Sequence, residues 1–304
     1  MPIGVAIVTY NRLNDLKKTL ELFARQSSLP AYLIVVDNAS TDGTGEFLKQ
    51  WASAPGAFPK HIILKEENTG GSGGFHTALE AAQKMDADWI WLSDDDAFPE
   101  PDALEVAGAF LSRQPDALTD ISAICGTVIN NGSIDTLHRR NLYRKGLRIV
   151  EQQIPASEYA RESFPLNCLS YIGAIINKAK LTDAGLTNKD YFLWYDDTEH
   201  SMRLSKCGKV LCVPAVRIHH DIPPERNQLT WKTYYGIRNQ ADLYRSHFPR
   251  ICYLFFCGKL LFKAACRTVL GRNPQLNRIT WAAIRDCANQ KFGLHPLYRP
   301  GWKP

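Results

Sequence analysis

The sequence predicts an α/β protein built on a doubly wound, mostly parallel sheet, with a helical region at its C-terminal end. Short apolar runs of strand length alternate with segments that carry apolar residues at helical spacing. Four of these runs end in polar residues, and parallel strands bring such ends to one edge of a sheet. Charge is also unevenly distributed, which separates a body at residues 1–230 from a basic region at residues 231–304.

The alternation of strand and helix begins at the N-terminus. Residues 3–9 (IGVAIVT) form a continuous β-branched run, as expected of a strand that is buried on both faces. Apolar residues at positions 13, 16, 20 and 23 then predict a helix over residues 13–25. The pattern continues with strands predicted at 32–37, 61–64 and 89–92, and with helices predicted at 44–51, 75–84 and 103–112.

The ends of the four strands predict a nucleotide site. They are followed by residues 9–12 (TYNR), 37–38 (DN), 68–70 (NTG) and 94–96 (DDD). In open α/β sheets, ligands bind beyond the carboxyl ends of the strands. The sequence contains no G-x-x-x-x-G-K-[ST] motif, which excludes a P-loop site. The turn after the first strand contains no glycine, so the usual dinucleotide-binding fold is not expected either.

Three consecutive aspartates end the fourth strand. Adjacent carboxylates repel one another and are costly to bury without a cation. Because alternate residues of an extended chain point the same way, Asp94 and Asp96 can converge on one ion. Hard oxygen ligands suit Mg²⁺ or Mn²⁺, which share their coordination shell with substrate phosphates. The alternative is a solvated acidic turn that precedes the next helix.

Several motifs together resemble family 2 glycosyltransferases of the GT-A fold. They are VTYNR, VVDNASTDGT, ENTGGSGGF, the triple aspartate, FLWYDDTEHSMRL at 192–204 and VPAVRIHH at 213–220. The resemblance spans residues 3–240 and implies a nucleotide-sugar transferase with a GT-A catalytic domain at residues 1–230. The GGSGGF, DDD and WYDD elements are most similar to bacterial galactofuranosyltransferases, and rhamnosyltransferases of the same family have closely similar motifs.

The resemblance implies which residues hold a metal ion and the donor. Asp94 and Asp96 would ligate Mn²⁺ or Mg²⁺, and the family pattern favours His220 over His219 as the third ligand. A histidine at the surface or the edge of the core is the alternative. Asp37 would hydrogen-bond the uracil or ribose of the donor, and Arg12 would contact its phosphate. Other residues expected at the donor are Thr9, Asn68, Gly70, Gly71 and Asp95. The glycines would let the backbone pass close to the donor sugar, in a loop that leads into the helix at residue 75.

A second acidic centre follows at Tyr195–Glu199. An inverting transfer needs a base that takes the proton from the acceptor hydroxyl. The resemblance implies that this base is Asp197, and that Asp196 binds the acceptor or orients the loop. An N-cap of the helix predicted at 198–207 is the structural alternative for Asp197. Trp194 would offer an apolar platform to sugar rings, or it would belong to the core.

The C-terminal region differs in charge from the body. Residues 231–304 hold 13 Lys and Arg against Asp242 and Asp286, a net charge of +11, whereas the rest holds 23 basic and 29 acidic residues, a net charge of −6. Helices are predicted at 231–247, 250–271 and 279–290. Lys259, Lys263 and Arg267 are spaced by four and form a basic stripe. The segment 250–271 would lie on an anionic membrane surface, or would pack on the body with its lysines in water.

These expectations describe an inverting, metal-dependent glycosyltransferase that moves galactofuranose from UDP-galactofuranose onto a cell-surface glycan or lipid-linked acceptor. A rhamnosyltransferase that uses dTDP-rhamnose is the alternative within the family. A nucleotidyltransferase and a non-catalytic glycan-binding module are the alternatives from other classes, and no nucleic-acid partner is expected. The 8 cysteines include no C-x-x-C pair and no signal peptide is recognised, so we expect a reduced cytoplasmic protein, peripheral at the inner face of the cell membrane.

Overall fold

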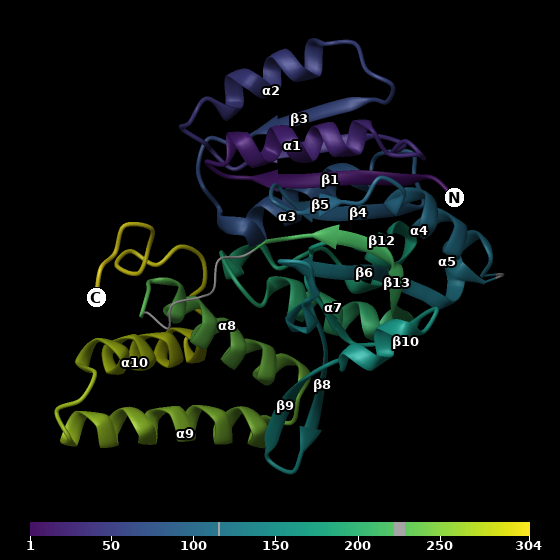
Figure 1. Ribbon diagram of the computed structural model, residues 1–304. Coiled ribbons are helices and arrows are strands. Elements are labelled where there is room, and N and C mark those ends of the chain that lie inside the picture. The colour runs from purple at the N-terminus through teal and green to yellow at the C-terminus, as the bar shows by residue number, and fades with distance from the viewer. Residues whose placement is uncertain (115, 222–228) are drawn as a thin grey trace.

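A ten-stranded sheet runs through the computed structural model, which describes residues 1–114, 116–221 and 229–304 (Figure 1). The strands lie in the order β10-β13-β6-β12-β4-β1-β2-β3, with β5 paired to β13 and β7 paired to β6. Their bounds are β1 Ile3–Thr9, β2 Leu33–Asp37, β3 Lys60–Leu64, β4 Trp89–Asp94, β5 Phe98–Pro99, β6 Ile121–Asn130, β7 Ser133–Ile134, β10 Phe164–Pro165, β12 Ala174–Asn177 and β13 Lys209–His219. The pairs β1–β2, β1–β4, β2–β3 and β6–β13 are parallel, and β12 is antiparallel to both of its neighbours. The prediction of a mostly parallel sheet is therefore confirmed.

Helices cover both faces of this sheet, as a doubly wound fold requires. The side chains of β1 alternate between the two faces of the sheet, and both faces are apolar. Val5 and Ile7 join one buried apolar cluster, while Ala6 and Val8 join another. The first cluster includes residues of α1, α2 and α4, and the second includes residues of α3, α6 and α7. The bounds are α1 Leu13–Ala24, α2 Thr44–Ser53, α3 Gly70–Ala82, α4 Ala103–Ser112, α5 Ala117–Asp120, α6 Leu181–Ala184 and α7 Asp196–Cys207.

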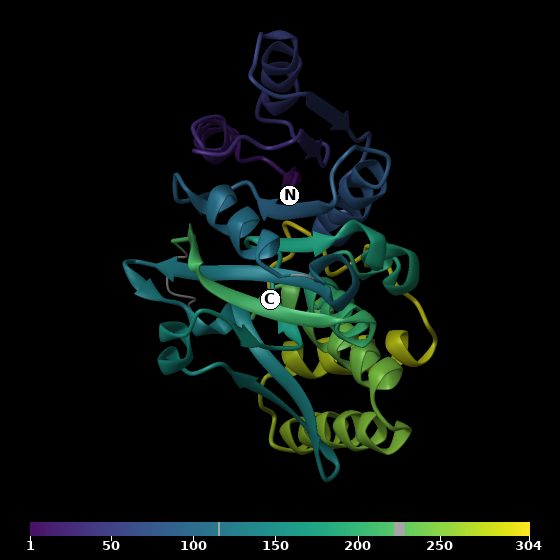
Figure 2. The same cartoon turned by 90° about the vertical axis from the view of Figure 1, so that its right-hand side faces the viewer.

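Three helices form the C-terminal region, which Figure 1 shows grouped beyond one side of the sheet. They are α8 Lys232–His247, α9 Arg250–Val269 and α10 Pro274–Ala288. A small second sheet, with the order β11-β8-β9, extends beside α9 (Figure 2). Its strands are β8 Arg139–Lys145, β9 Arg148–Gln153 and β11 Cys168–Leu169, and the short 3₁₀ helices of the chain are Thr136–His138, Ala156–Ala160, Lys178–Lys180 and Lys189–Tyr191. The β8–β9 hairpin has no counterpart among the elements predicted from the sequence.

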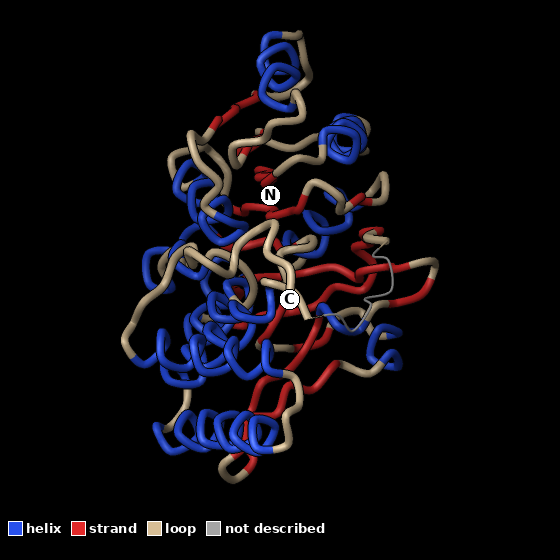
Figure 3. Tube along the Cα trace, turned by 90° about the vertical axis from the view of Figure 1, so that its left-hand side faces the viewer, coloured by secondary structure: helices blue, strands red, loops and turns tan. Residues whose placement is uncertain are grey.

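The end of the chain returns from α10 towards the edge of the sheet, as the tube view shows (Figure 3). Tyr298 stacks on Tyr234 of α8, with ring centroids 5.1 Å apart. The hydroxyl of Tyr235 donates to the carbonyl oxygen of Tyr298 at 2.8 Å. These contacts fasten the last residues to α8, and they bring Pro300 to the cavity described below.

Two predicted element starts are corrected by the structure. The glycine-rich segment was expected as a loop that ends at residue 75, yet α3 already begins at Gly70. Glycine disfavours a helix interior by about 1 kcal/mol relative to alanine, which is why the sequence pattern misplaces this start. The last helix begins at Pro274 rather than at residue 279, with the proline in its first turn, where the missing N–H costs nothing.

All eight cysteines are free, and six of them are buried. This agrees with the prediction of thiols held in the core. Among the helices of the described residues, none is both long enough and apolar enough to cross a bilayer.

Candidate active site

The triple aspartate lies at the carboxyl edge of the sheet, beside the end of β1. Val8 and Asp94 are partners in the parallel pairing of β1 with β4. The next residue of β1, Thr9, is buried and donates its hydroxyl to Asp95 Oδ2 at 2.7 Å. Thr19 of α1 donates to the backbone carbonyl of Asp95 at 2.6 Å. These two bonds fix the middle aspartate within the turn, between Asp94 and Asp96.

Asp96 lies between an arginine and a histidine. Arg12, from the turn after β1, forms an ion pair with Asp96 Oδ2 and lies 3.8 Å from Asp95 Oδ1. On the other side, His220 Nε2 is 3.3 Å from Asp96 Oδ1. The adjacent His219 turns away and meets Glu100, with its Nε2 3.1 Å from the carboxylate. Of the two histidines, only His220 therefore reaches the aspartates.

The turn into α3 is held by Asn38, the residue after β2. Its amide nitrogen donates to Asn68 Oδ1 at 3.0 Å and to the carbonyl of Gly70 at 2.9 Å. Gly70 has φ of +73°, and a Cβ there would collide with the carbonyl oxygen of Phe192. At Gly71 a Cβ would meet nothing within 4 Å, because this residue faces open space. The amide of Gly70 donates to Asn68 Oδ1 at 2.8 Å, and the amide of Ser72 donates to the carbonyl of Phe192 at 3.3 Å. The start of α3 is thus held against the turn that precedes α7.

The turn before α7 has a strained backbone that α8 holds in place. Three of its residues have positive φ without being glycine, namely Phe192, Trp194 and Tyr195. Such conformations cost on the order of 1–3 kcal/mol each and persist where surrounding groups enforce them. The buried side-chain amide of Asn239 in α8 lies 2.9–3.0 Å from three carbonyl oxygens, those of Tyr191, Leu193 and Trp194. The buried Arg238 adds a bond of 2.8 Å to the carbonyl of Tyr191.

Asp197 lies in the first turn of α7 and does not act as its N-cap. The helix begins at Asp196, and its N-cap residue Tyr195 makes no side-chain capping bond. Asp197 Oδ1 instead accepts from the amide and the hydroxyl of Thr198, at 2.5 and 3.0 Å. The same hydroxyl accepts a bond of 3.1 Å from Arg140 Nη2 of β8. Thr198 thus connects the Asp197 carboxylate to a guanidinium that no sequence motif marked.

Two adjoining cavities bring these groups together. A cavity of about 550 Å³ is lined by the triple aspartate, Thr9, Arg12, Asn38, Asn68, Gly70 and His220. A second cavity of about 740 Å³ is lined by Asp196, Asp197, Thr198, Arg140, His138 and α8 residues that include Ile237. Four residues line both cavities, namely Gly71, Asp94, Leu193 and Trp194. We call the first the aspartate cavity and the second the α7 cavity.

Every site residue predicted from the sequence lines one of the two cavities except Asp37. Asp37 is buried at the end of β2, where its Oδ1 accepts from the amide of Ser40 at 3.0 Å. Its neighbour Asn38 lines the aspartate cavity instead. Trp194, which had two open interpretations, is 39% exposed and faces both cavities, so it is not a core residue. Sequence reasoning missed Arg140 and His138, because their β-hairpin and its approach to α7 depend on tertiary contacts.

The carboxylates of the site are desolvated and influence one another. Burial raises the pKa of Asp95 to about 7, and burial together with the charge of Asp197 raises the pKa of Asp196 to about 8. Burial also raises the pKa of Asp94; the positive charges of His220 and Arg12 oppose this shift and the negative charge of Asp197 adds to it. For Asp197, burial raises the pKa, while Arg140 and the bonds from Thr198 lower it. Asp94 and Asp197 therefore interact across the boundary of the two cavities.

The residues present fit a hard divalent cation that is shared with a ligand. In residues 1–114, 116–221 and 229–304, no three His, Cys, Asp or Glu side chains are grouped so as to hold a metal by themselves. Asp96 and His220 nevertheless meet at one point, and the Arg12 guanidinium already neutralises that carboxylate. Mg²⁺ and Mn²⁺ are usually held by one or two carboxylates together with substrate phosphates, which suits such an incomplete set.

Comparison with known proteins decides the family. The model of the family described as "Glycosyl transferase family 2" matches residues 4–164, more than half of the chain. The chain belongs to glycosyl transferase family 2. It is therefore a glycosyltransferase that takes its sugar from a nucleotide donor, and the GT-A fold implied by the motifs is confirmed by the solved structures that it resembles.

The chain is similar to several known proteins, including the following three. Galactofuranosyltransferase GlfT1 of Mycobacterium tuberculosis is 28% identical over 219 residues, which cover 71% of this chain and 69% of GlfT1. Abequosyltransferase RfbV of Salmonella typhimurium is 27% identical over 193 residues, 60% of this chain and 55% of RfbV. The crystal structure of GalNAc-T7 with UDP, GalNAc and Mn²⁺ superposes with a TM-score of 0.62 at 14% identity, covering 95% of this chain and 56% of that one.

Proposed function

We propose that this glycosyltransferase binds a nucleotide sugar in the aspartate cavity and an acceptor in the α7 cavity, and transfers the sugar with inversion at its anomeric carbon. The observation that carries the proposal is the junction of the two cavities at Gly71, Asp94 and Trp194. A donor sugar at this junction would have the diphosphate on one side and the acceptor hydroxyl on the other. Direct displacement requires that arrangement, with nucleophile and leaving group on opposite sides of the reacting carbon.

In this proposal Asp197 is the general base. Its carboxylate takes the proton of the acceptor hydroxyl while that oxygen forms a bond to the anomeric carbon. The bond from this carbon to the diphosphate breaks, and the nucleoside diphosphate leaves with the electron pair. Thr198 and Arg140 hold Asp197 in position, and burial raises its pKa above that of an ordinary aspartate. A base with a raised pKa accepts a proton more readily, provided that it is ionised at the working pH.

The leaving diphosphate needs positive charge beside the triple aspartate. Asp94, Asp96 and His220 would hold Mn²⁺ or Mg²⁺, which would neutralise the charge that develops on the diphosphate. With Mn²⁺ or Mg²⁺ held by Asp96, Arg12 would be free to contact a phosphate of the donor. Gly71, in the first turn of α3, adds a backbone N–H at the same cavity. Thr9, Asn68 and Asp95 would shape the donor pocket from the ends of the strands.

UDP-galactofuranose is the donor that we propose. The motifs shared with galactofuranosyltransferases support it, and so does the similarity to GlfT1 over 71% of the chain. The second candidate is dTDP-rhamnose, because rhamnosyltransferases share the motifs, and the similarity to RfbV shows that relatives of this chain move other sugars as well. The proposed acceptor is a cell-surface or lipid-linked glycan, which the enzyme would reach at the inner face of an anionic membrane through its basic region at 250–271.

A screen of nucleotide sugars tests the proposal. The purified chain would be incubated with Mn²⁺, a synthetic glycan acceptor and UDP-galactofuranose, UDP-galactopyranose, dTDP-rhamnose or GDP-mannose, with and without EDTA. We expect release of UDP from UDP-galactofuranose that requires the metal, and a product whose anomeric configuration in NMR spectra is the inverse of the donor's. Preferential use of dTDP-rhamnose would favour the second candidate. Failure to consume any of these donors would contradict the proposal.

A further inference from the structure

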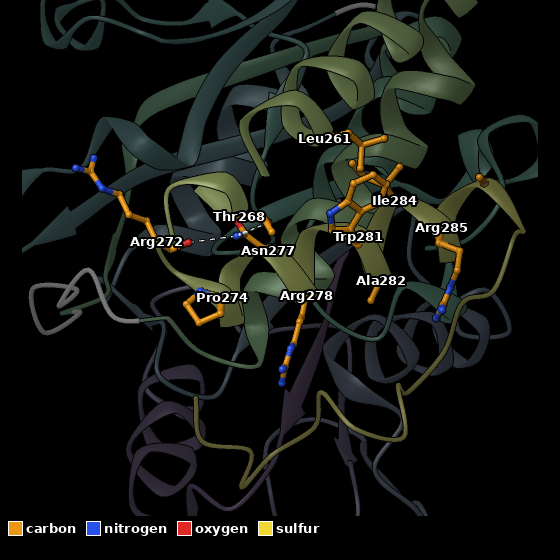
Figure 4. Close-up of a pocket in the computed structure, with 12 residues that line it drawn as sticks. Leu261, Thr268, Arg272, Pro274, Asn277, Arg278, Trp281, Ala282, Ile284 and Arg285 are labelled. Carbon is orange, nitrogen blue, oxygen red and sulfur yellow. Dashed lines mark hydrogen bonds between the residues drawn. The ribbon is translucent and has the colours of Figure 1, made fainter. Parts of the chain in front are cut away.

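A groove of about 880 Å³ runs between α9 and α10, apart from the two cavities of the candidate active site (Figure 4). Leu261 of α9 and Trp281 and Ile284 of α10 give it an apolar surface. Arg272, Arg278 and Arg285 stand along its margins, and Figure 4 shows the side chains of Arg278 and Arg285 extending away from the apolar residues. A groove of this composition combines apolar contact area with fixed positive charge.

The apolar side chains around this groove are unusually exposed for a protein surface. Trp281 is 50% exposed, Phe262 and Val269 on α9 are 71% and 87% exposed, and Leu270 directly after α9 is 63% exposed. Over its whole length α9 buries only Cys252, Cys257 and Ala264. Tyr253, Phe256, Leu260 and Leu261 are partly buried against apolar clusters, but packing of α9 on the body still leaves Ile251, Leu254, Phe262 and Val269 exposed. Clusters of exposed apolar residues mark surfaces that contact a membrane or another molecule.

The charge of residues 231–304 indicates whether a membrane or another molecule is the partner of this surface. Asp242 and Asp286 are the only acidic residues in the region 231–304, and both are buried. Asp242 accepts from the hydroxyl of Tyr191 at 2.7 Å, and Asp286 accepts from the hydroxyl of Tyr234 at 2.8 Å. Asp242 also pairs with Arg245, and Asp286 pairs with Arg285. Beyond these two aspartates, the region holds no Asp or Glu that would balance its other basic residues.

The arginines differ in how freely they can bind an anion. Arg285 lies 3.1 Å from Asp286, whereas Arg272 and Arg278 form no ion pair with any described residue. Arg267, the third member of the basic stripe predicted from the sequence, donates to Asn277 of α10 at 2.8 Å and so helps to join the two helices. The positive charge available to a ligand is thus found at the groove as well as along the stripe.

We propose that the α9–α10 groove binds an anionic phospholipid of a bilayer. The acyl chains would contact Leu261, Trp281 and Ile284, and the headgroup phosphate would be held by Arg272 and Arg278. Tryptophan suits the boundary between chains and headgroups because its ring is apolar and its N–H is polar. Arginine suits phosphate because its planar guanidinium donates two parallel hydrogen bonds.

The groove is also well located for transfer to a lipid-linked acceptor. Ile237 of α8 lines the α7 cavity and packs in the same apolar cluster as Leu261 and Ile284 of the groove. One apolar cluster therefore connects the groove with the wall of the α7 cavity, so a bilayer at the groove would hold the acceptor cavity near the membrane surface. Only the role of the groove in reaching a lipid-linked acceptor rests on the proposed function. Lipid binding itself is measured separately from sugar transfer.

The first test is flotation of the full chain with vesicles of phosphatidylcholine, with and without phosphatidylglycerol. We expect binding only to the anionic vesicles. Arg272→Gln/Arg278→Gln should weaken it roughly fivefold per arginine, about 25-fold in all. The control is Lys49→Gln/Lys84→Gln, which removes two exposed charges from α2 and from the turn after α3. Equal weakening in the two double variants, or equal binding to both kinds of vesicle, would overturn the proposal.

The second test asks whether the groove itself meets the acyl chains. Phospholipids with brominated acyl chains should quench tryptophan fluorescence of the wild-type chain more than that of Trp281→Phe, although other tryptophans are present. Equal quenching would overturn the proposal. Full release of the chain from vesicles by millimolar inorganic phosphate would also overturn the proposal, because it would indicate a simple anion site. A dimer in sedimentation equilibrium that Trp281→Phe abolishes would overturn it as well, because the groove would then be an interface between two copies of the chain. Transfer to a water-soluble acceptor should be unchanged in both groove variants, so failure of lipid binding and failure of the transferase proposal are distinguishable.

Discussion

Asp94 and Asp197 face one cavity from different parts of the chain. Asp94 is the last residue of β4 and Asp197 lies in the first turn of α7, yet both line the α7 cavity, and the charge of Asp197 raises the pKa of Asp94. Asp94 also lines the aspartate cavity, so the proposed donor and acceptor sites meet at this residue. A protein in which the two acidic motifs served separate surfaces would not show this relationship.

The two adjacent histidines provide a matched test of the metal site. His220 meets Asp96, whereas His219 meets Glu100 outside both cavities. His220→Ala and Asp96→Ala should each raise the Mn²⁺ concentration needed for half-maximal donor binding by at least about tenfold, the effect typical of a lost ligand or ligand partner. His219→Ala should leave it unchanged. Calorimetric titration of UDP at several Mn²⁺ concentrations measures this, and unchanged metal dependence in His220→Ala would refute the ligand assignment.

Gly70 and Gly71 should respond differently to alanine. At Gly70, φ is +73° and a Cβ would strike the carbonyl of Phe192, so Gly70→Ala should lower the free energy of unfolding by at least about 1 kcal/mol. Gly71→Ala should fold with equal or greater stability, because alanine favours a helix and its Cβ meets no protein atom. That Cβ would project into the junction of the two cavities, so the donor KM should rise. Thermal unfolding and donor kinetics together separate the two effects.

Arg140 should set the pH range of the reaction. Asp197 must be ionised to accept a proton, so kcat/KM should fall as the pH drops below its pKa, which burial raises above the ordinary aspartate value. Arg140 opposes that shift, so Arg140→Gln should move the acidic limb of the pH profile to higher pH. Asp196 titrates together with Asp197, so the apparent pKa read from the acidic limb of the pH profile belongs to both carboxylates. Arg144→Gln, an exposed residue of the same strand, is the control, and an equal shift in both variants would contradict this role.

Asn239 should act through the turn that it holds. Asn239→Ala would remove the amide that lies 2.9–3.0 Å from three carbonyl oxygens of the turn before α7. Leaving buried carbonyls unpaired costs about 1–3 kcal/mol, so the melting temperature should fall. Because Trp194 and Asp197 would lose their fixed positions, acceptor KM and kcat should worsen more than donor affinity. Equal loss of donor and acceptor binding would show that the residue serves only global stability.

The sequence predicts the sheet and its ligand edge well, because those signals are local. The bounds of β1 and α4 agree with the prediction to the residue, since each is an unbroken run with one periodicity. Polar residues after parallel strands meet at one edge by topology alone, which is why residues as distant as Thr9 and Asp95 were expected together.

The parts that could not be predicted depend on tertiary contacts. The helical start at Gly70 is enforced by Asn38 and by the turn at Phe192, against the low helix propensity of glycine. The sequence also could not show that Asp37 would be buried at the end of β2, where it accepts from the amide of Ser40, so its contact with the donor stays a prediction. Arg140 reaches Thr198 only because the β8 hairpin folds beside α7, and no local pattern contains that information.

The most direct test of the account is the behaviour of Asp197→Asn. Asparagine keeps the size and polarity of the side chain but cannot accept the proton, so turnover with UDP-galactofuranose and acceptor should fall by about 10²- to 10⁴-fold. Calorimetric titration should show UDP binding in the presence of Mn²⁺ within about twofold of the wild type, because Asp197 does not line the aspartate cavity. Asp183→Asn, an exposed residue of α6, should change neither quantity. Undiminished turnover in Asp197→Asn, or a loss of UDP binding as large as the loss of turnover, would contradict the assignment of the base on which the account depends.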